Sequence, residues 1–410
     1  MKKLVILAAM VLAFTVQGFS QNPDDLVAQA REAIKNFNIQ AADEAYKSAM
    51  KAADETQYTA IQEEWQILEK INISLADARR SMDRSEYESA LQKYNESLAM
   101  MDASPQDIWG KVKAEAYYSM GMVHYRQDKP IEAAEEFKSA QGLDPQEEKY
   151  GRAIENVRNK AYSEGHKYYR RKDFTSARDQ YKIAVTVDPS FASGFYQLAL
   201  IAKREGDYAS AEKYYRDAVT SDPTHYKGWY GLGSLYSGMG NNNKAIESLK
   251  MSISINASYE KAYYSLARVY ESQKNYSQAI ENLKMALEID KEYQLAYELL
   301  AKIYIDQENY SATIALLKNV SPKTASYKTE YHLAQAYNNT GDFAAALTAA
   351  TKSLTKKRNW APALVEKGDA LKGLNRNKDA VVAYRAAAQD ARWKSVAEYR
   401  INELTKWEGK

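Results

Sequence analysis

Residues 192–223 read ASGFYQLALIAKREGDYASAEKYYRDAVTSDP, and this stretch decides the fold. Apolar residues recur at spacings of three and four in both halves, which predicts two helices and no strand. Between the halves stands Gly206-Asp207-Tyr208, where glycine can end one helix and aspartate can cap the next. Pro223 cannot continue the second helix. The stretch is therefore expected to be a helix–turn–helix pair.

The same pattern recurs along the chain. Alanine returns every 34 residues at Ala177, Ala211, Ala245 and Ala279, and a small residue stands twelve positions before each. Ten units follow this pattern, and only one of them departs from it, with Thr313 in place of the second small residue. A large residue follows the second small one by four positions in nine units: Tyr46, Tyr94, Phe137, Tyr181, Tyr215, Leu249, Leu283, Leu317 and Tyr384. Closely crossing helices need small side chains at the crossing, with a large one filling the space beside it.

This set of residues resembles the tetratricopeptide repeat family. The resemblance covers nearly all of residues 23–394 and is clearest at Phe195, Leu198, Ala199, Gly206, Tyr208, Ala211, Tyr215, Ala218 and Pro223. It implies an all-α fold, a right-handed α-solenoid of about ten helix pairs with a carboxyl-terminal capping helix, because such pairs bury their apolar faces only against neighbours.

Four segments are expected along the chain. Residues 1–20 are interpreted as a signal peptide, 21–157 as irregular repeats with extended helices, 158–394 as the regular superhelix, and 395–410 as the capping helix and tail. Extra residues at 56–70, 105–113 and 148–157 are interpreted as longer first helices. The unit beginning at Gln294 looks truncated near Ser321-Pro322.

The amino-terminal residues predict export. Lys2 and Lys3 precede an apolar run over 4–16, and Gly18 and Ser20 suit cleavage before Gln21. The run is shorter than the roughly 20 residues of a membrane-spanning helix, although an uncleaved anchor is the alternative. The chain has no cysteine, which excludes disulfides, thiolate metal sites and a lipid-modified cysteine. We expect a periplasmic or extracellular protein that is soluble after cleavage.

No motif for catalysis or for cofactor binding is present. The four histidines stand far apart in sequence, and none begins a zinc-binding motif. Gly231-Leu232-Gly233 lacks the preceding strand and following Gly-Lys-Ser/Thr of a nucleotide-binding loop. The 56 Lys and Arg residues nearly balance the 54 Asp and Glu residues, so charge gives no footprint for nucleic acid. We expect no enzyme, no cofactor and no bound metal.

The resemblance implies that the first helices line a concave groove, which takes peptide segments or helices of partner proteins. Two sets of residues are expected to face it: Tyr118, Tyr162, Tyr196, Tyr230 and Tyr264, and the cations Arg126, Arg170, Arg204, Arg268 and Lys302. Lys227 and Lys261 add to the positive charge, against Glu271 and Asp306, so the groove between about 118 and 302 is expected to favour an acidic or aromatic-compatible segment. Each set has a structural alternative: the tyrosines can serve packing alone, and a cation at a helix carboxyl end gains about 0.3–1 kcal/mol in any case.

The sequence therefore predicts a protein-binding scaffold or adaptor of the bacterial cell envelope. The alternative is a glycan-binding accessory module whose tyrosines stack on sugars. An enzyme is the third alternative. The oligomeric state and the identity of the partner stay open.

Overall fold

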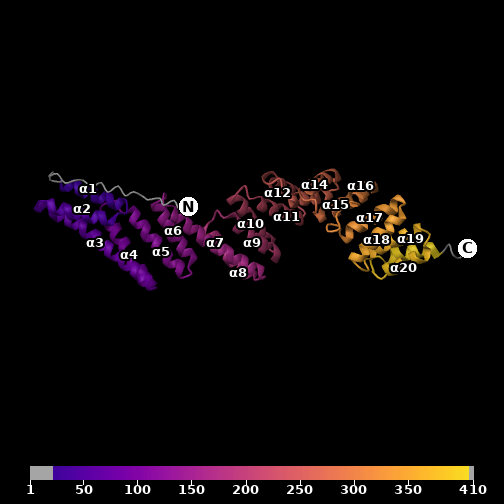
Figure 1. Cartoon of the computed structure of the whole chain (residues 1–410), viewed down its shortest axis with the longest axis horizontal. Coiled ribbons are helices and arrows are strands. Elements are labelled where there is room, and N and C mark those ends of the chain that lie inside the picture. The colour runs from indigo at the N-terminus through magenta and orange to yellow at the C-terminus, as the bar shows by residue number, and fades with distance from the viewer. Residues whose placement is uncertain (1–21, 406–410) are drawn as a thin grey trace, which may run out of the picture. The chain divides into compact units, whose positions relative to one another are not determined.

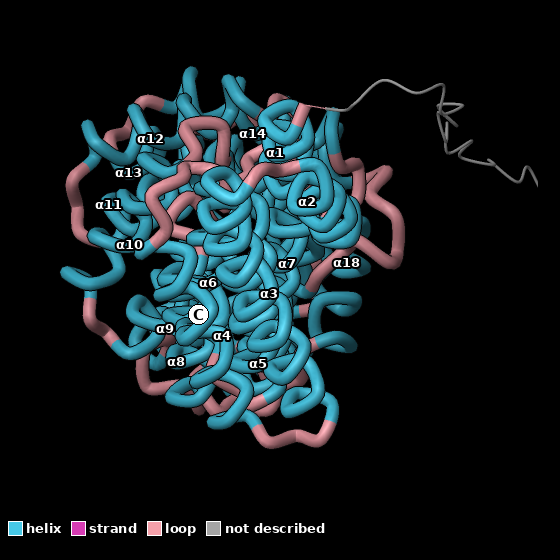
Figure 2. The backbone as a smooth tube through the Cα atoms, turned by 90° about the vertical axis from the view of Figure 1, so that its left-hand side faces the viewer, coloured by secondary structure: helices cyan, strands magenta, loops and turns pink. Residues whose placement is uncertain are grey.

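The computed structural model describes residues 22–405, and within them the chain forms 21 α-helices and no strand (Figures 1 and 2). The described chain falls into two compact units, which divide between Ser190 and Phe191. We call them unit 1 and unit 2. The predicted signal peptide at 1–20 lies outside the described residues. This division concerns compactness, so it does not test the predicted change in repeat regularity at residues 157–158.

Unit 1 consists of four helix pairs. They are α1 (Pro23–Lys35) with α2 (Ile39–Ala52), α3 (Glu55–Asp83) with α4 (Tyr87–Ala103), α5 (Gly110–Arg126) with α6 (Pro130–Leu143), and α7 (Glu148–Arg170) with α8 (Phe174–Val187).

Unit 2 continues with six pairs and a last helix. The pairs are α9 (Ala192–Glu205) with α10 (Tyr208–Ser221), α11 (Tyr226–Gly238) with α12 (Asn242–Ile255), α13 (Glu260–Ser272) with α14 (Tyr276–Ile289), α15 (Gln294–Asp306) with α16 (Tyr310–Leu317), α17 (Tyr327–Thr340) with α18 (Phe343–Lys356), and α19 (Ala361–Gly373) with α20 (Asn377–Ala387). Helix α21 (Lys394–Thr405) packs on α20 and buries Ala397 and Leu404. The predicted all-α solenoid of about ten pairs is confirmed.

The helix crossings are as close as the repeat pattern predicts. A Cβ built on Gly233 of α11 would lie 2.5 Å from Leu249 of α12, and one on Gly165 of α7 would lie 2.6 Å from Tyr181 of α8. The large partners themselves are almost completely buried. Only a small residue therefore fits opposite each of them, and this contact fixes the spacing within a pair.

The turns within pairs also follow the sequence. Asp173, Asp207 and Asp342 each accept a hydrogen bond from the backbone N–H three residues on, over 3.0–3.1 Å. Gly206 and Gly341 end the preceding helices with φ of 82°, a left-handed conformation that glycine adopts without strain.

The irregular junctions divide into confirmed and corrected predictions. Helix α3 has 29 residues and α7 has 23, so the extra residues at 56–70 and 148–157 do lengthen first helices. The segment 105–113 was expected to do the same and does so only from Gly110; residues 104–109 connect α4 to α5 without forming a helix. Pro105 explains the difference, because proline removes a backbone donor and disfavours helix in the residue before it. The predicted truncation appears as α16, which has only 8 residues.

Candidate functional site

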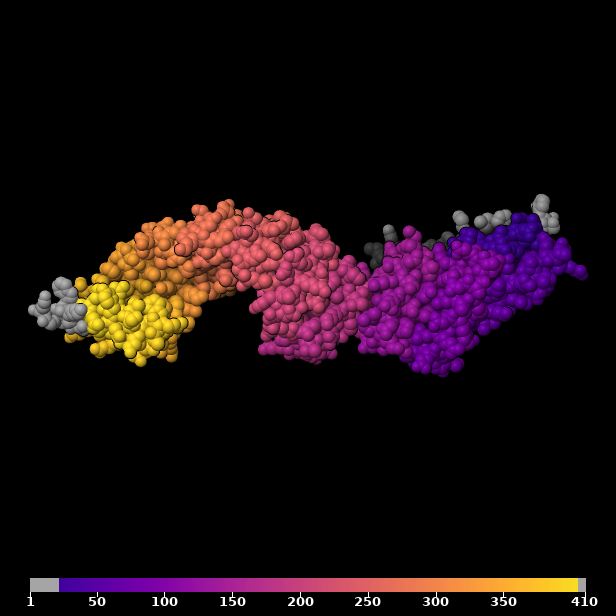
Figure 3. Space-filling model, turned by 180° about the vertical axis from the view of Figure 1, so that it is seen from behind, coloured from indigo at the N-terminus to yellow at the C-terminus, as the bar shows by residue number. Residues whose placement is uncertain are grey.

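Successive first helices of unit 2 lie side by side. Helix α9 contacts α11, α11 contacts α13, α13 contacts α15, α15 contacts α17, and α17 contacts α19. In Figure 1, α12, α14 and α16 lie along the upper margin of this unit, with α11 and α15 below them. Figure 3 shows the unit bowed, with a hollow between its pink beginning and its yellow end. We call the side formed by the first helices the inner face and the side formed by α10, α12 and α14 the outer face.

The predicted tyrosine column packs against neighbouring rings. Tyr230 of α11 meets Tyr259 edge to face with ring centres 5.1 Å apart, and Tyr264 of α13 meets Tyr293 in the same way at 5.4 Å. Tyr196 of α9 lies 5.6 Å from the ring of His225. All three tyrosines are half-buried. Their rings hold adjacent repeats together and leave part of their surface to solvent.

In unit 1 the two predicted tyrosines have similar surroundings. Tyr118 of α5 lies 5.5 Å from the rings of both Phe137 and Tyr150. Tyr162 of α7 lies 5.6 Å from Tyr181. Both are half-buried. The whole predicted column is thus partly committed to packing.

The structure adds a second aromatic column that the sequence reasoning missed. Its members stand at the amino-terminal caps of α11, α13, α15 and α19, and they are His225, Tyr259, Tyr293 and Trp360. Each packs on the inner-face tyrosine of the preceding repeat, as Trp360 does on Tyr331 at 5.0 Å. The signal was present in the sequence, because three of them follow one another at the 34-residue step.

Burial keeps these tyrosines protonated. It raises the pKa of Tyr259, Tyr264 and Tyr293, and raises that of Tyr331 to about 12. At neutral pH these four tyrosines therefore have hydroxyl groups that can donate hydrogen bonds, and they carry no negative charge.

The predicted cations are all exposed, but their surroundings differ. Arg126, Arg170 and Arg204 lie in the last turns of α5, α7 and α9, where a positive charge favours the helix end. Lys302 of α15 is neutralised, because its ammonium lies 2.6 Å from Glu271 and 3.0 Å from Asp306. Arg268 of α13 has no ion pair within the described part of the chain.

A further inner-face cation escaped the sequence reasoning. Lys203 of α9 is half-buried, and burial lowers its pKa. Its ammonium donates a hydrogen bond to the Ser234 hydroxyl on α11 over 3.0 Å, and no carboxylate among residues 22–405 pairs with it. A half-buried charge without a counter-ion is costly.

On α17 the inner-face cation Lys328 also has a carboxylate partner. Lys328 of α17 lies 3.2 Å from Glu298 of α15. They line a small hollow of about 200 Å³ with His332, whose pKa burial lowers to about 4. The imidazole is thus neutral at physiological pH. Lys302 and Lys328 are thus paired with carboxylates, whereas Lys203 and Arg268 have no carboxylate partner among the described residues.

Comparison with known families decides what this array is. Four tetratricopeptide repeat models match the sequence, at residues 114–147, 162–226, 202–270 and 260–293. Tetratricopeptide repeats are therefore present in this chain over residues 114–147 and 162–293. No curated protein sequence matches it.

Several solved structures are similar to part of the chain. One from Parabacteroides merdae is 19% identical and covers 60% of this chain and 98% of its own, with a TM-score of 0.42. The pilF protein of Pseudomonas aeruginosa is 15% identical over 51% of this chain and 96% of its own, with a TM-score of 0.46. YrrB, described as having an unusual peptide-binding site, is 18% identical over 45% of this chain and 89% of its own, with a TM-score of 0.30. These values concern the fold alone.

The described part of this tetratricopeptide repeat protein contains no group of three metal-ligating side chains. His225 caps α11 by accepting a hydrogen bond from the Gly228 N–H over 3.0 Å, and His166 shares a hydrogen bond with the Tyr181 hydroxyl over 3.1 Å. Both imidazoles thus have structural contacts. Within residues 22–405 no helix is both long and apolar enough to span a membrane.

Proposed function

We propose that this tetratricopeptide repeat protein is a scaffold or adaptor of the bacterial cell envelope that holds peptide segments or helices of partner proteins. The observation that carries the proposal is the charge pattern of the inner face. Lys203, Lys227, Lys261 and Arg268 lie on α9, α11 and α13 without a carboxylate partner among the described residues. Half-buried tyrosine rings lie on the same three helices.

Charge complementarity selects an acidic partner segment. A carboxylate beside Lys203 would supply the counter-charge that the half-buried ammonium lacks. Lys302 has two carboxylates already, so it adds little attraction. The acidic segment therefore binds over α9–α13, a shorter part of the groove than the sequence predicted.

The tyrosines favour a protein ligand over a glycan. Stacking on a sugar needs an open ring face. Tyr230 and Tyr264 instead contact Tyr259 and Tyr293 edge to face, and all four rings are half-buried.

The test compares two triple variants that change net charge equally. The inner variant carries Lys227→Gln, Lys261→Gln and Arg268→Gln. The outer variant carries Lys213→Gln, Lys250→Gln and Lys284→Gln on α10, α12 and α14, all exposed positions. Each is used for affinity purification from the native cell envelope after gentle cross-linking, with mass spectrometry of the retained proteins.

We expect the native chain and the outer variant to retain the same proteins and the inner variant to lose them. Three lost charge contacts should weaken binding roughly tenfold or more. Retention of the same proteins by the inner variant would show that binding lies elsewhere. A native chain that retains nothing specific would contradict the scaffold itself.

A further inference from the structure

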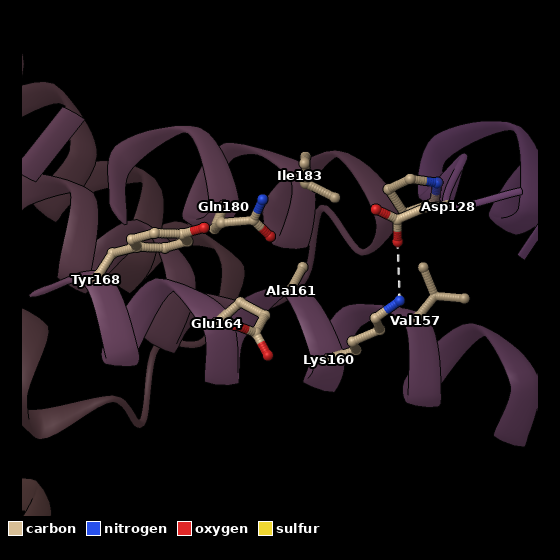
Figure 4. A pocket seen from close by; sticks show the side chains of 9 residues that line it. Asp128, Val157, Lys160, Ala161, Glu164, Tyr168, Gln180 and Ile183 are labelled. Atoms are coloured by element: carbon tan, nitrogen blue, oxygen red, sulfur yellow. Dashed lines mark hydrogen bonds and ion pairs between the residues drawn. The ribbon is translucent and has the colours of Figure 1, made fainter. Parts of the chain in front are cut away.

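A hollow of about 380 Å³ opens between α7 and α8, the two helices of one repeat in unit 1 (Figure 4). These helices supply most of its lining: Val157, Ala161, Glu164, Tyr168, Gln180 and Ile183. Figure 4 shows Tyr168 and Gln180 at one end and the ion pair of Lys160 with Asp128, 2.9 Å apart, at the other. The volume is at the lower end of the range of about 300–1,000 Å³ for small-molecule sites.

Two departures from the repeat pattern open this hollow. At the position of Ala161, the next four repeats have an aromatic residue: Phe195, Trp229, Tyr263 and Tyr297. At the position of Glu164, the same four repeats have a leucine that is at most 3% exposed: Leu198, Leu232, Leu266 and Leu300. Helix α7 thus lacks a ring and a buried leucine where the other repeats have both, and the space is left open.

A carboxylate at this position has no evident structural use. A leucine here would bury apolar surface and stabilise the repeat. The side chain of Glu164 is 37% exposed, and its Oε1 accepts a hydrogen bond from the Lys167 ammonium over 2.5 Å. An ion pair so open to water contributes little to stability. A residue that breaks the pattern of its neighbours without such a gain is typical of a binding site.

The polar groups of the hollow suit a ligand rich in hydroxyl groups. The carboxylate of Glu164 only accepts hydrogen bonds, whereas the Gln180 amide and the Tyr168 hydroxyl both donate and accept them. Neither of these last two groups has a hydrogen-bond partner among residues 22–405. In α11 the corresponding hydroxyl of Tyr236 does have one, because it donates to Glu212 over 2.8 Å. The hollow therefore has unused donors and acceptors side by side.

The charges around the hollow balance one another. Lys160 is paired with Asp128, and Lys167 is paired with Glu164. No excess of either sign therefore selects a cation or an anion. The remaining wall, which includes Ile183, is apolar. A sugar ring fits both features, because its hydroxyl groups lie around the edge and its CH groups form an apolar face.

We infer that the hollow between α7 and α8 binds a single neutral sugar ring. Glu164 accepts hydrogen bonds from the hydroxyl groups of the sugar, and Gln180 and Tyr168 provide the other polar contacts. The CH face of the sugar packs on Ala161 and Ile183, in the space that an aromatic ring fills in the next four repeats. This ligand is additional to the partner proteins of the proposed function, and its site is separate from the tyrosine column.

The test uses the full chain with ¹³C-labelled isoleucine δ1 methyl groups. The resonance of Ile183, assigned with Ile183→Val, reports on the hollow. Three neutral sugars are titrated, each with a charged counterpart: glucose with glucuronate, galactose with galacturonate, and N-acetylglucosamine with glucosamine. We expect at least one neutral sugar to shift the Ile183 resonance in a saturable way, with a Kd at least about fivefold lower than that of its counterpart.

Two variants that reproduce the other repeats should close the site and still fold. Glu164→Leu supplies the missing leucine, and Ala161→Phe supplies the missing ring. Each should abolish the saturable shift, while circular dichroism and the thermal midpoint show that the chain is folded. Glu155→Leu, at an exposed position on the same helix, is the control and should leave the Kd unchanged.

Three results would overturn the inference. The first is an Ile183 resonance that responds to none of the neutral sugars. The second is a charged counterpart that binds as tightly as its neutral sugar or more tightly. The third is a Glu164→Leu variant that binds the sugar with the Kd of the native chain, since the carboxylate would then make no contact with it.

Discussion

Glycine at a helix crossing sets how closely the two helices of a repeat approach. Gly233 and Gly238 lie on the same helix, α11, but in different surroundings. A Cβ on Gly233 would meet Leu249 at 2.5 Å, whereas one on Gly238 would meet nothing within 4 Å. We therefore expect Gly233→Ala to destabilise the protein by about 1–3 kcal/mol through overpacking.

Gly238→Ala is the matched control and should be neutral or stabilising by up to about 1 kcal/mol, because alanine favours helix. Denaturant titrations followed by circular dichroism measure both variants. Equal midpoints for the two would show that the crossing tolerates a larger spacing.

A buried acid in unit 2 makes stability depend on pH. Glu366 of α19 is only 9% exposed. Burial, with a smaller contribution from Asp369, raises its pKa to about 7, although the Asn338 amide donates to it over 2.8 Å and Arg400 of α21 favours ionisation. Between its usual pKa of 4.5 and about 7, the folded protein binds a proton that the unfolded chain releases. This contribution to stability is therefore complete below pH 4.5 and is lost as the pH rises through 7.

Glu366→Gln removes this titration and retains the contact with Asn338. We expect the free energy of unfolding of the variant, relative to that of the native chain, to rise by as much as about 3 kcal/mol between pH 5 and pH 8. Thermal midpoints at the two pH values measure the gain. Glu288→Gln, at an exposed position on α14, is the control and should show no such gain. A Glu366→Gln difference that is the same at both pH values would contradict the buried charge.

Some single residues of the candidate site could be predicted from the sequence, and others could not. The tyrosine column follows from the 34-residue step. The ion pair of Lys302 with Glu271 does not, because Glu271 stands 31 residues away and its approach depends on how α13 and α15 pack. Lys203 was missed for the same reason, since its burial is a property of the stacked helices.

At the scale of the helix, capping aspartates define where second helices begin. Asp207 accepts a hydrogen bond from the Ser210 N–H over 3.0 Å at the start of α10. Replacing it by alanine should cost about 0.5–2 kcal/mol, because a backbone donor loses its partner. The thermal midpoint measures this loss.

Glu86 provides the comparison, since it precedes α4 and makes no capping hydrogen bond with its side chain. Glu86→Ala should leave the midpoint unchanged. A loss of the same size in both variants would point to a cause other than the cap.

Helix lengths were predictable where local chemistry decides them. The long first helices α3 and α7 contain no proline, and the structure has both. The segment at 105–109 failed because Pro105 interrupts the helix, and the repeat step alone gave no reason to weigh it. The sequence predicted a truncated unit near Ser321-Pro322, and the structure has the short α16, which already ends at Leu317.

At the scale of the whole molecule, export is a prediction about the amino terminus. The positive head, apolar run and small residues before Gln21 indicate cleavage by a signal peptidase. Protein isolated from its native cells should begin at Gln21, as amino-terminal sequencing or intact mass would show. A chain that retains Met1 or begins inside the apolar run would contradict the predicted cleavage.

The solenoid as a whole was the most predictable level, because one pattern repeats through the chain and each repeat contacts mainly its neighbours. The division between Ser190 and Phe191 was not predicted. No glycine- or proline-rich linker marks it, and the 34-residue step continues across it from Ala177 to Ala211. Compactness depends on packing that composition does not record.

Site-specific photo-cross-linking in native cells tests the central claim, which is that the inner face of α9–α13 holds the partner. A benzophenone amino acid replaces either Arg268 on α13 or Met285 on α14, two exposed positions on the first and second helices of one repeat. We predict that the probe at position 268 forms a specific cross-linked product of higher mass and that the probe at position 285 does not. A product from position 285 alone would place the partner on the outer face and contradict the account.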